Sequence, residues 1–348
     1  MPTVELACTR RVLQKRRPLT ISRGTSSETE NLFLEVRHGS LVGIGEMAPI
    51  GYEVAQSAVR AEQELLSLSD CLAGVEPFSI HAVEQAAAAA GVCSSAMAAL
   101  NMACWDWVGR RVGQPVWRLL GLSGRTVPTS VTVGINPPER VRELVQELFA
   151  EVGAEVSLKL KLGGPEGVEA DKAVFAAARE SLWPGATIRV DANGGWSDSD
   201  APAMLRWLAE RGCDYAEQPV AFEDACALKC LRQRPLPVYL DESVKTSRDV
   251  PAVAAYCDGV NIKLMKCGGI SEALRIVHTA RAHGLRTMLG CFSESSLSIT
   301  AAAQLSDLID AIDLDSHLNL ANDPFQGATL VEGRLVCSAA PGLGVVPR

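Results

Sequence analysis

The sequence predicts an α/β fold: a parallel barrel of alternating strands and helices, preceded by a separate α+β domain. Eight short apolar runs alternate with amphipathic stretches in the larger, later part of the chain. Charged residues fall at the C-terminal ends of these runs, which is where barrel enzymes carry their chemistry. The first 125 residues lack this alternation, and a length of 348 residues suggests about two domains.

The first domain, residues 1–125, has the pattern of a separate α+β unit. Its expected antiparallel strands are Thr3–Leu13, Asn31–Arg37 and Leu41–Glu46, and its expected helices are Glu53–Leu68 and Ser79–Val108. We expect the boundary to the barrel at Gly121–Arg125.

The barrel domain is expected to span residues 126–328. Its eight strands are expected at Thr129–Ile135, Glu155–Leu162, Thr187–Asp191, Asp214–Glu217, Val238–Asp241, Gly259–Lys263, Arg286–Cys291 and Ala311–Asp315. A doubly wound open sheet would alternate in the same way, but no glycine-rich GxGxxG turn follows an early strand. Residues 329–348 have strand character, and we expect them to pack back against the first domain.

Composition excludes several classes of protein. A net charge of −8 and a pI near 5.3 argue against nucleic-acid binding, which needs a basic surface. No apolar stretch approaches the roughly 20 residues that span a bilayer, and no signal peptide is visible at the N-terminus. Eleven cysteines without CxxC spacing are typical of reduced thiols, so we expect a cytoplasmic protein.

Three carboxylates end consecutive strands of the predicted barrel. Asp191, Glu217 and Asp241 are separated by 26 and 24 residues, one barrel unit each, so their side chains should converge at the rim. Three unpaired anions would repel one another, and an all-oxygen set with open positions suits Mg²⁺. Capping of the following helices could explain any one of these acids, but it explains three in register poorly.

Two lysines share one face of the second strand. Lys159 and Lys161 are two residues apart in VSLKLKLGG, and Lys263 ends the sixth strand on the opposite side of the barrel. The alternative is a strand with lysines facing water. Lysines on opposite sides of a metal-bound carboxylate substrate would let one remove the α-proton and the other return one. The base lysine needs a lowered pKa, which nearby positive charge such as that of Lys159 would provide.

The Lys-x-Lys strand, the three acidic strand ends and the segment IKLMKCGGI resemble the muconate-lactonising subgroup of the enolase superfamily over nearly the whole chain. The resemblance implies that Lys161 and Lys263 are the acid/base pair, that Lys159 assists, and that Asp191, Glu217 and Asp241 bind Mg²⁺. It also implies a modified TIM barrel of the (β/α)7β type with an N-terminal α+β capping domain. The same resemblance implies proton transfer through an enediolate intermediate, the chemistry known for such sites, and it allows a homo-oligomer.

Asp313 and Asp315 lie two residues apart in the eighth predicted strand. Two inward aspartates would hold a substrate ammonium group, and the pair resembles the Asp-x-Asp motif of dipeptide epimerases such as the L-Ala-D/L-Glu epimerases. The expected enzyme is therefore an isomerase, a racemase or epimerase that acts on amino acid derivatives and inverts the Cα of the C-terminal residue of a dipeptide. The alternatives are a cycloisomerase or o-succinylbenzoate synthase with the same catalytic residues, or a non-catalytic barrel that binds ligands.

Further substrate-binding candidates are less specific. In the family, loops near residues 18–26 and 47–56 close over the barrel, which makes Arg23 and Tyr52 candidates. Arg23 would favour an acidic substrate, unless it is simply an exposed arginine of the loop. Glu53, which follows Tyr52, would favour a cationic substrate, so the two candidates conflict. At the end of the seventh strand the candidates for lining the pocket are Cys291, Ser293 and Glu294.

Overall fold

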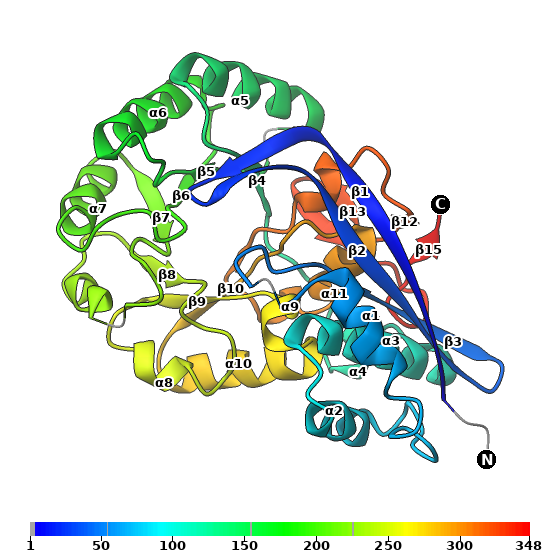
Figure 1. The fold of residues 1–348 in the computed structure, drawn as a ribbon. Helices are drawn as coiled ribbons and strands as arrows, with labels where there is room; N and C mark the ends of the chain where they lie inside the picture. The colour runs from blue at the N-terminus through cyan, green and yellow to red at the C-terminus, as the bar shows by residue number, and fades with distance from the viewer. Residues whose placement is uncertain (1–3, 54, 154, 225) are drawn as a thin grey trace.

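The computed structural model describes residues 4–53, 55–153, 155–224 and 226–348. It contains a three-stranded antiparallel sheet followed by an eight-stranded parallel sheet (Figure 1). The predicted fold class is confirmed: a barrel sheet carries the second part of the chain, and an antiparallel sheet with helices precedes it. Two residues within predicted elements, Thr3 and Val54, lie outside the described residues.

The antiparallel sheet has longer strands than the sequence predicted. Its elements and the helices that pack on it are β1 (Glu5–Ile21), β2 (Gly24–His38), β3 (Leu41–Met47), α1 (Ala58–Leu66), α2 (Ile80–Ala89), α3 (Ser94–Val112) and α4 (Val116–Leu119). The β1–β2 hairpin includes residues 18–26, expected as a loop, and turns tightly at Ser22 and Arg23. Both faces of this tip are largely polar, so its sequence lacks the alternation that marks a strand.

The single helix expected at Ser79–Val108 is two helices, α2 and α3. Gly91 interrupts them with φ at +75°, a left-handed conformation that side-chain-bearing residues rarely adopt. The run of alanines before it favours helix strongly, and this run masks the break in the sequence.

All eight predicted barrel strands are present. They are β4 (Ser130–Val133), β5 (Ser157–Lys161), β6 (Ile188–Asp191), β7 (Cys213–Glu217), β8 (Val238–Leu240), β9 (Gly259–Ile262), β10 (Arg286–Leu289) and β11 (Ala311–Ile312). They form the sheet in sequence order, and a parallel bridge between Thr129 and Ile312 brings the last strand beside the first. The barrel is therefore nearly closed.

Helices connect the strands around the outside of the barrel (Figure 1). They are α5 (Pro138–Val152), α6 (Val168–Ser181), α7 (Ala201–Ala209), η1 (Ala227–Leu231), α8 (Val250–Val253), α9 (Leu264–Cys267), α10 (Ile270–Ala282) and α11 (Ser296–Ala303). After β7 the described part of the connection contains η1, a short 3-10 helix, as its one helical segment.

An aromatic layer, with the guanidinium of Arg189 5.2 Å from the centre of the Tyr215 ring, lies in the barrel below the acidic strand ends. Tyr215 and Tyr239 precede Glu217 and Asp241 by two residues, so they point inward one layer lower. Their rings lie 4.6 Å apart and pack with Met288. This aromatic layer closes the interior below the charged strand ends.

The chain ends beside the capping domain. Two short pairs, β12 (Phe325–Gln326) with β15 (Val346–Pro347) and β13 (Thr329–Val331) with β14 (Arg334–Val336), form its last strands. Buried Asp106 of α3 accepts hydrogen bonds from the backbone N–H groups of Leu343 (2.8 Å) and Ile44 (3.0 Å). Gly333 instead contacts the barrel, accepting from the N–H of Thr129 at 2.8 Å.

Asp106→Asn will lower the free energy of unfolding by about 1–3 kcal/mol, because one carboxylate oxygen becomes an NH₂ group that faces a donor. Chemical denaturation followed by circular dichroism measures the change. The exposed Asp198→Asn is the control, with an expected change within about 0.5 kcal/mol. Equal stability of the two variants would show that Asp106 does not hold the C-terminal segment.

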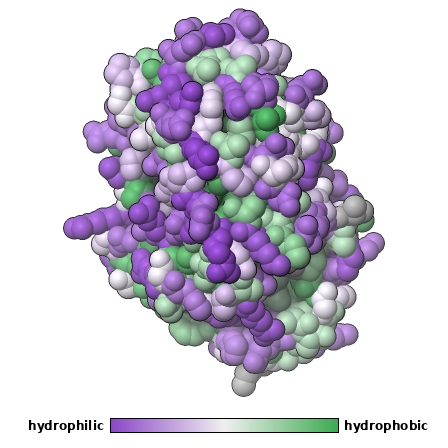
Figure 2. Space-filling view, turned by 90° about the vertical axis from the view of Figure 1, so that its left-hand side faces the viewer, coloured by the Kyte–Doolittle hydropathy of each residue, from purple (hydrophilic) through white to green (hydrophobic). Residues whose placement is uncertain are grey.

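Among the described residues, no helix is both long enough and apolar enough to cross a bilayer. One face of the molecule is covered mainly by hydrophilic side chains, with hydrophobic residues scattered between them (Figure 2). All eleven cysteines are free thiols, as expected for reduced cysteines.

Candidate active site

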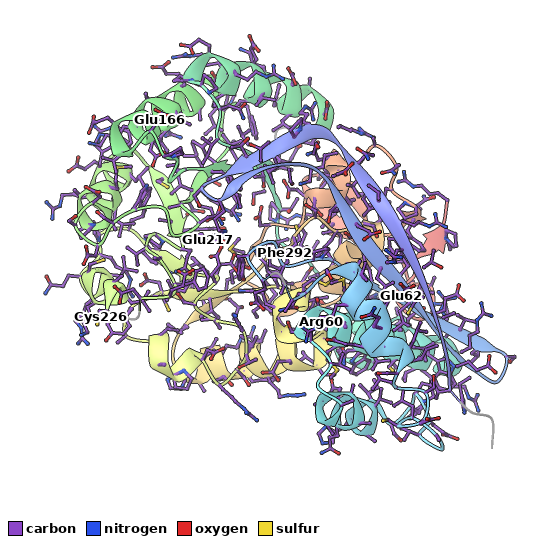
Figure 3. All side chains as sticks on the ribbon, viewed as in Figure 1. Arg60, Glu62, Glu166, Glu217, Cys226 and Phe292 are labelled. Carbon is purple, nitrogen blue, oxygen red and sulfur yellow. The ribbon has the colours of Figure 1, made fainter. Side chains whose placement is uncertain are left out.

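The three acidic strand ends meet at one rim of the barrel. Strand register places Lys161 opposite Asp191 and Asp191 opposite Glu217, so β5, β6 and β7 end together. Asp191 and Glu217 are fully buried, and Asp241 is 1% exposed. Burial, with the negative charge of Asp191, raises the pKa of Glu217 to about 8. Figure 3 shows Glu217 within the ring of strands, away from the outer helices.

Lys159 lies among these acids. Its Nζ is 2.5 Å from Asp313 Oδ2, 2.8 Å from Glu217 Oε2 and 3.4 Å from Asp191 Oδ2. Burial alone would lower the pKa of this ammonium, but the negative charges of Asp313 and Glu217 raise it well above its usual value. Lys159 is therefore a cation held by carboxylates, buried below the substrate cavity.

Lys161 and Lys263 face each other across the barrel. Lys161 ends β5 and Lys263 follows β9, and four strand positions separate β5 from β9 in the eight-stranded sheet. Lys161 Nζ lies 2.5 Å from Asp191 Oδ2, and Lys263 Nζ lies 2.7 Å from Asp241 Oδ2. Both lysines line a cavity of about 400 Å³ above the carboxylates.

The pKa of Lys263 departs from the lowered value expected for a base. Burial would lower it, but the negative charge of Asp241 and then of Glu217 raises it. The ammonium also lies 4.5 Å from the centre of the Phe292 ring, a contact that favours the charged form. The sequence pattern predicts that Lys263, Asp241 and Glu217 lie close together, but it does not show whether the nearby carboxylates raise or lower the pKa of the lysine.

The oxygen atoms around the acids fit a hard cation. Three buried oxygens beside the acids lack a hydrogen-bond donor among the described residues: Glu242 Oε2, Asn193 Oδ1 and Asn261 Oδ1. Two more, Glu217 Oε2 and Asp241 Oδ2, face a lysine ammonium at 2.8 Å and 2.7 Å. Unsatisfied buried oxygens are costly, and an oxygen-binding cation such as Mg²⁺ satisfies them. As the side chains stand, no three His, Cys, Asp or Glu of the described chain are grouped closely enough to hold an ion. Lysine ammonium groups lie between the acids instead.

The two aspartates after β11 both line the cavity, but they differ in their partners. Asp313 pairs with Lys159 and accepts from Ser130 Oγ at 2.7 Å, and its pKa is lowered because the charge of Lys159 outweighs burial. Asp315 accepts the N–H of Thr132 at 2.6 Å and pairs with no lysine or arginine of the described residues. Burial and the charge of Asp313 raise the pKa of Asp315 to about 6. Asp315 is thus the less neutralised acid of the pair.

Arg23 reaches the site from the tip of the β1–β2 hairpin. Its guanidinium donates to Glu242 Oε1 at 2.6 Å and to the Asn193 carbonyl at 2.8 Å, and it lies 5.0 Å from the centre of the Tyr52 ring. The other charged candidate, Glu53, pairs with Lys245 at 2.5 Å. The conflict between an acidic and a cationic preference therefore disappears, since protein groups neutralise both candidates.

Of the three candidates after β10, two line the cavity and one does not. Cys291 and Ser293 line the cavity, and burial raises the pKa of the Cys291 thiol, which suits a packing residue. Glu294 was expected in the pocket and does not line it. Its carboxylate turns back to accept the Phe292 N–H at 2.8 Å and the Ser298 hydroxyl at 2.6 Å, which fixes the start of α11.

Several residues of the site were not predicted. Glu242 follows Asp241 directly in LDES, Asn193 follows Asp191 in DAN, and Asn261 precedes Lys263 in NIK, so each lay beside a candidate. Lys266 of α9 is 3% exposed, and its Nζ lies 2.5 Å from Asp241 Oδ1. Phe292 had no signal beyond its place between Cys291 and Ser293.

A parallel barrel with acids, opposed lysines and a substrate-sized cavity at its C-terminal rim defines a barrel enzyme that works on a small molecule. Residues 140–348 match the family model "Enolase C-terminal domain-like", and residues 4–121 match "Mandelate racemase / muconate lactonizing enzyme, N-terminal domain". The chain belongs to this family of the enolase superfamily.

Individual relatives agree with this assignment. A hydrophobic dipeptide epimerase of Roseobacter litoralis is 50% identical over 336 residues, covering 96% of each chain, and one of Flavobacteria bacterium MS024-2A is 48% identical over 335 residues, covering 95% of each. The crystal structure of a dipeptide epimerase from Enterococcus faecalis V583, in complex with Mg and L-Leu-L-Tyr, matches with a TM-score of 0.93, 30% identity and 99% coverage of both chains. The prediction of an isomerase of the epimerase class is confirmed by these relatives.

Proposed function

We propose that this protein epimerises the Cα of the C-terminal residue of dipeptides with apolar side chains, using Mg²⁺. The observation that carries the proposal is the placement of Lys161 and Lys263 on opposite strands around one cavity that also contains Asp313 and Asp315. The names of the relatives support the substrate class.

The chain's own residues divide the reaction between them. Asp315, with Asp313, binds the substrate ammonium group, which fixes the dipeptide's position along the cavity. Either Lys161 or Lys263 removes the Cα proton from one face, and the other delivers a proton to the opposite face, which inverts the carbon. Asp191, Glu217 and Asp241 would hold Mg²⁺, with Lys159 beneath them. When bound, Mg²⁺ would supply positive charge at the substrate carboxylate.

An apolar preference follows from the charge balance of the cavity. Arg23 is neutralised by Glu242 and Glu53 by Lys245, so neither offers an unpaired charge to a substrate side chain. Among the residues that line the cavity, Leu19, Ile21 and Phe292 are apolar. Beside Arg23 and Glu53, a charged side chain would therefore lose its hydration without gaining an unpaired partner. Two other charged residues of the lining, Lys15 and Glu28, form hydrogen bonds with Ser26 and Gln14.

A panel of L,L-dipeptides incubated with the protein and Mg²⁺ in D₂O tests this function by mass spectrometry. Dipeptides with apolar residues will gain one deuterium at the C-terminal Cα and form the L,D-epimer. Dipeptides ending in Glu or Lys will react at least about tenfold more slowly. Failure of every dipeptide to take up deuterium would contradict the proposal, and a preference for charged residues would contradict its apolar part.

The aspartate pair gives a separate prediction. Asp315→Asn will reduce kcat/KM for a reactive dipeptide by about 10²-fold, because a charge-assisted hydrogen bond to the ammonium is lost. The N-acetylated form of the same dipeptide lacks the ammonium and is the matched probe. Because this probe is a poor substrate of the wild-type protein already, Asp315→Asn should change kcat/KM for it little. An equal loss for both substrates would exclude ammonium binding by Asp315.

We also propose a cytoplasmic location. The free state of all eleven cysteines supports it, because reduced thiols are typical of that compartment.

A further inference from the structure

A second cavity, of about 320 Å³, adjoins the first near Asp315. It lies between barrel strand β4, helix α5 and residues 16–20 of β1. Its apolar lining consists of Leu19, Val131, Val133, Leu144, Leu148, Val152 and Leu318. The catalytic scheme above does not use it.

The two cavities share a wall. Leu19, Thr132, Asp315 and Asn319 line both of them. Within this wall Thr132 donates its backbone N–H to Asp315 Oδ2, so the acid that anchors the ammonium group stands at the border of the second cavity. A group held at Asp315 therefore lies at the entrance to this second space.

The charges around the second cavity are largely compensated. Arg17 pairs with Glu147 at 3.3 Å and also with Glu151. Arg140 pairs with Glu143 at 2.7 Å and with Glu147 at 2.8 Å. Arg17 and Arg140 are thus bound to acids of α5, and the third basic residue of the lining, Arg16, donates to the backbone carbonyl of Leu320 at 3.1 Å. The lining between them is largely apolar. A neutral, apolar group fits this space better than an anion does.

We propose that the second cavity binds the side chain of the substrate's N-terminal residue and selects large apolar side chains there. The inference rests on the proposed function. In a dipeptide the ammonium nitrogen and the Cβ of the first residue are attached to the same Cα. An ammonium group at Asp315 consequently places the first side chain beside the shared wall, whereas the C-terminal residue stays between Lys161 and Lys263 in the first cavity.

Filling the second cavity tests the proposal. Leu148→Phe adds bulk to the lining from α5, and Val152→Phe does the same from the next turn, which provides a second variant if the first folds poorly. Ala150→Phe is the matched control, because Ala150 is exposed on the same helix and does not line the cavity. Circular dichroism and thermal melting establish that each variant is folded.

The substrates are L-Leu-L-Leu and Gly-L-Leu, which differ only in the first side chain. Wild-type protein should prefer L-Leu-L-Leu by about tenfold or more in kcat/KM. Filling the cavity should reduce kcat/KM for L-Leu-L-Leu by about tenfold and leave Gly-L-Leu within about twofold, and the control should change neither. Equal losses for both substrates, or no loss for either, would overturn the assignment of the second cavity. The proposed function would still stand in that case, provided that the wild-type protein epimerises the dipeptides. Absence of epimerisation by wild type would instead overturn the function itself.

Discussion

Lys161→Ala and Lys263→Ala will each reduce epimerisation of an apolar dipeptide by about 10²–10⁴-fold, the usual contribution of a positioned acid or base. In the proposed mechanism each lysine serves one face of the substrate carbon, so removal of either should block inversion in both directions. The two variants should differ in which epimer still exchanges its Cα proton with solvent. One will still exchange the Cα proton of the L,L-dipeptide with solvent, and the other only that of the L,D-dipeptide, as measured by NMR in D₂O.

Lys172→Ala is the control for these variants. Lys172 lies on α6 outside the barrel and pairs with Glu169, so its loss should leave kcat/KM within about twofold. The assignment of the lysines to opposite faces would fail if both alanine variants exchanged the same epimer. It would also fail if either variant retained wild-type epimerisation.

Removal of divalent cations will abolish activity, and Mg²⁺ will restore it. Dialysis against EDTA should lower epimerisation by at least about 10³-fold, because a bound cation contributes several kcal/mol to stabilising charge on the substrate. Glu217→Gln should lose most of its bound metal, measured by elemental analysis of the purified protein. Glu223→Gln, an exposed residue in the loop after β7, should retain wild-type metal content.

Thermal melting gives a readout of this metal site that does not depend on activity. Mg²⁺ at 100 times its dissociation constant should stabilise the wild-type protein by about 2.7 kcal/mol and stabilise Glu217→Gln much less. Full activity after EDTA treatment, or equal metal content in the two variants, would contradict the assignment of these acids as ligands.

The strand ends were predictable from the sequence because barrel geometry fixes them. Parallel strands in register bring Asp191 and Glu217 side by side, and period-two alternation puts Lys159 and Lys161 on the inner face. The spacing of one barrel unit between the acids was therefore enough to predict that their side chains meet at one rim of the barrel. The long β1–β2 hairpin was missed because its exposed residues show no apolar alternation.

Pairing between side chains was not predictable in the same way. The sequence does not show that Glu242 neutralises Arg23, since the two are 219 residues apart in the chain. It likewise does not show that the Glu294 carboxylate turns toward Ser298, because a rotation about side-chain bonds decides between the cavity and the helix. Substrate specificity depends on such pairings, so the proposed apolar preference could not be argued from the sequence alone.

The central claim is that two lysines on opposite faces invert one carbon. Isotope content of the product at low conversion tests it most directly. Wild-type protein with Mg²⁺ and an apolar L,L-dipeptide in D₂O should give an L,D-product that carries deuterium at the C-terminal Cα in nearly every molecule, because the second lysine delivers a solvent-derived proton. A product that retains the substrate's own protium would show that a single base carries the proton across, and would contradict the two-lysine account.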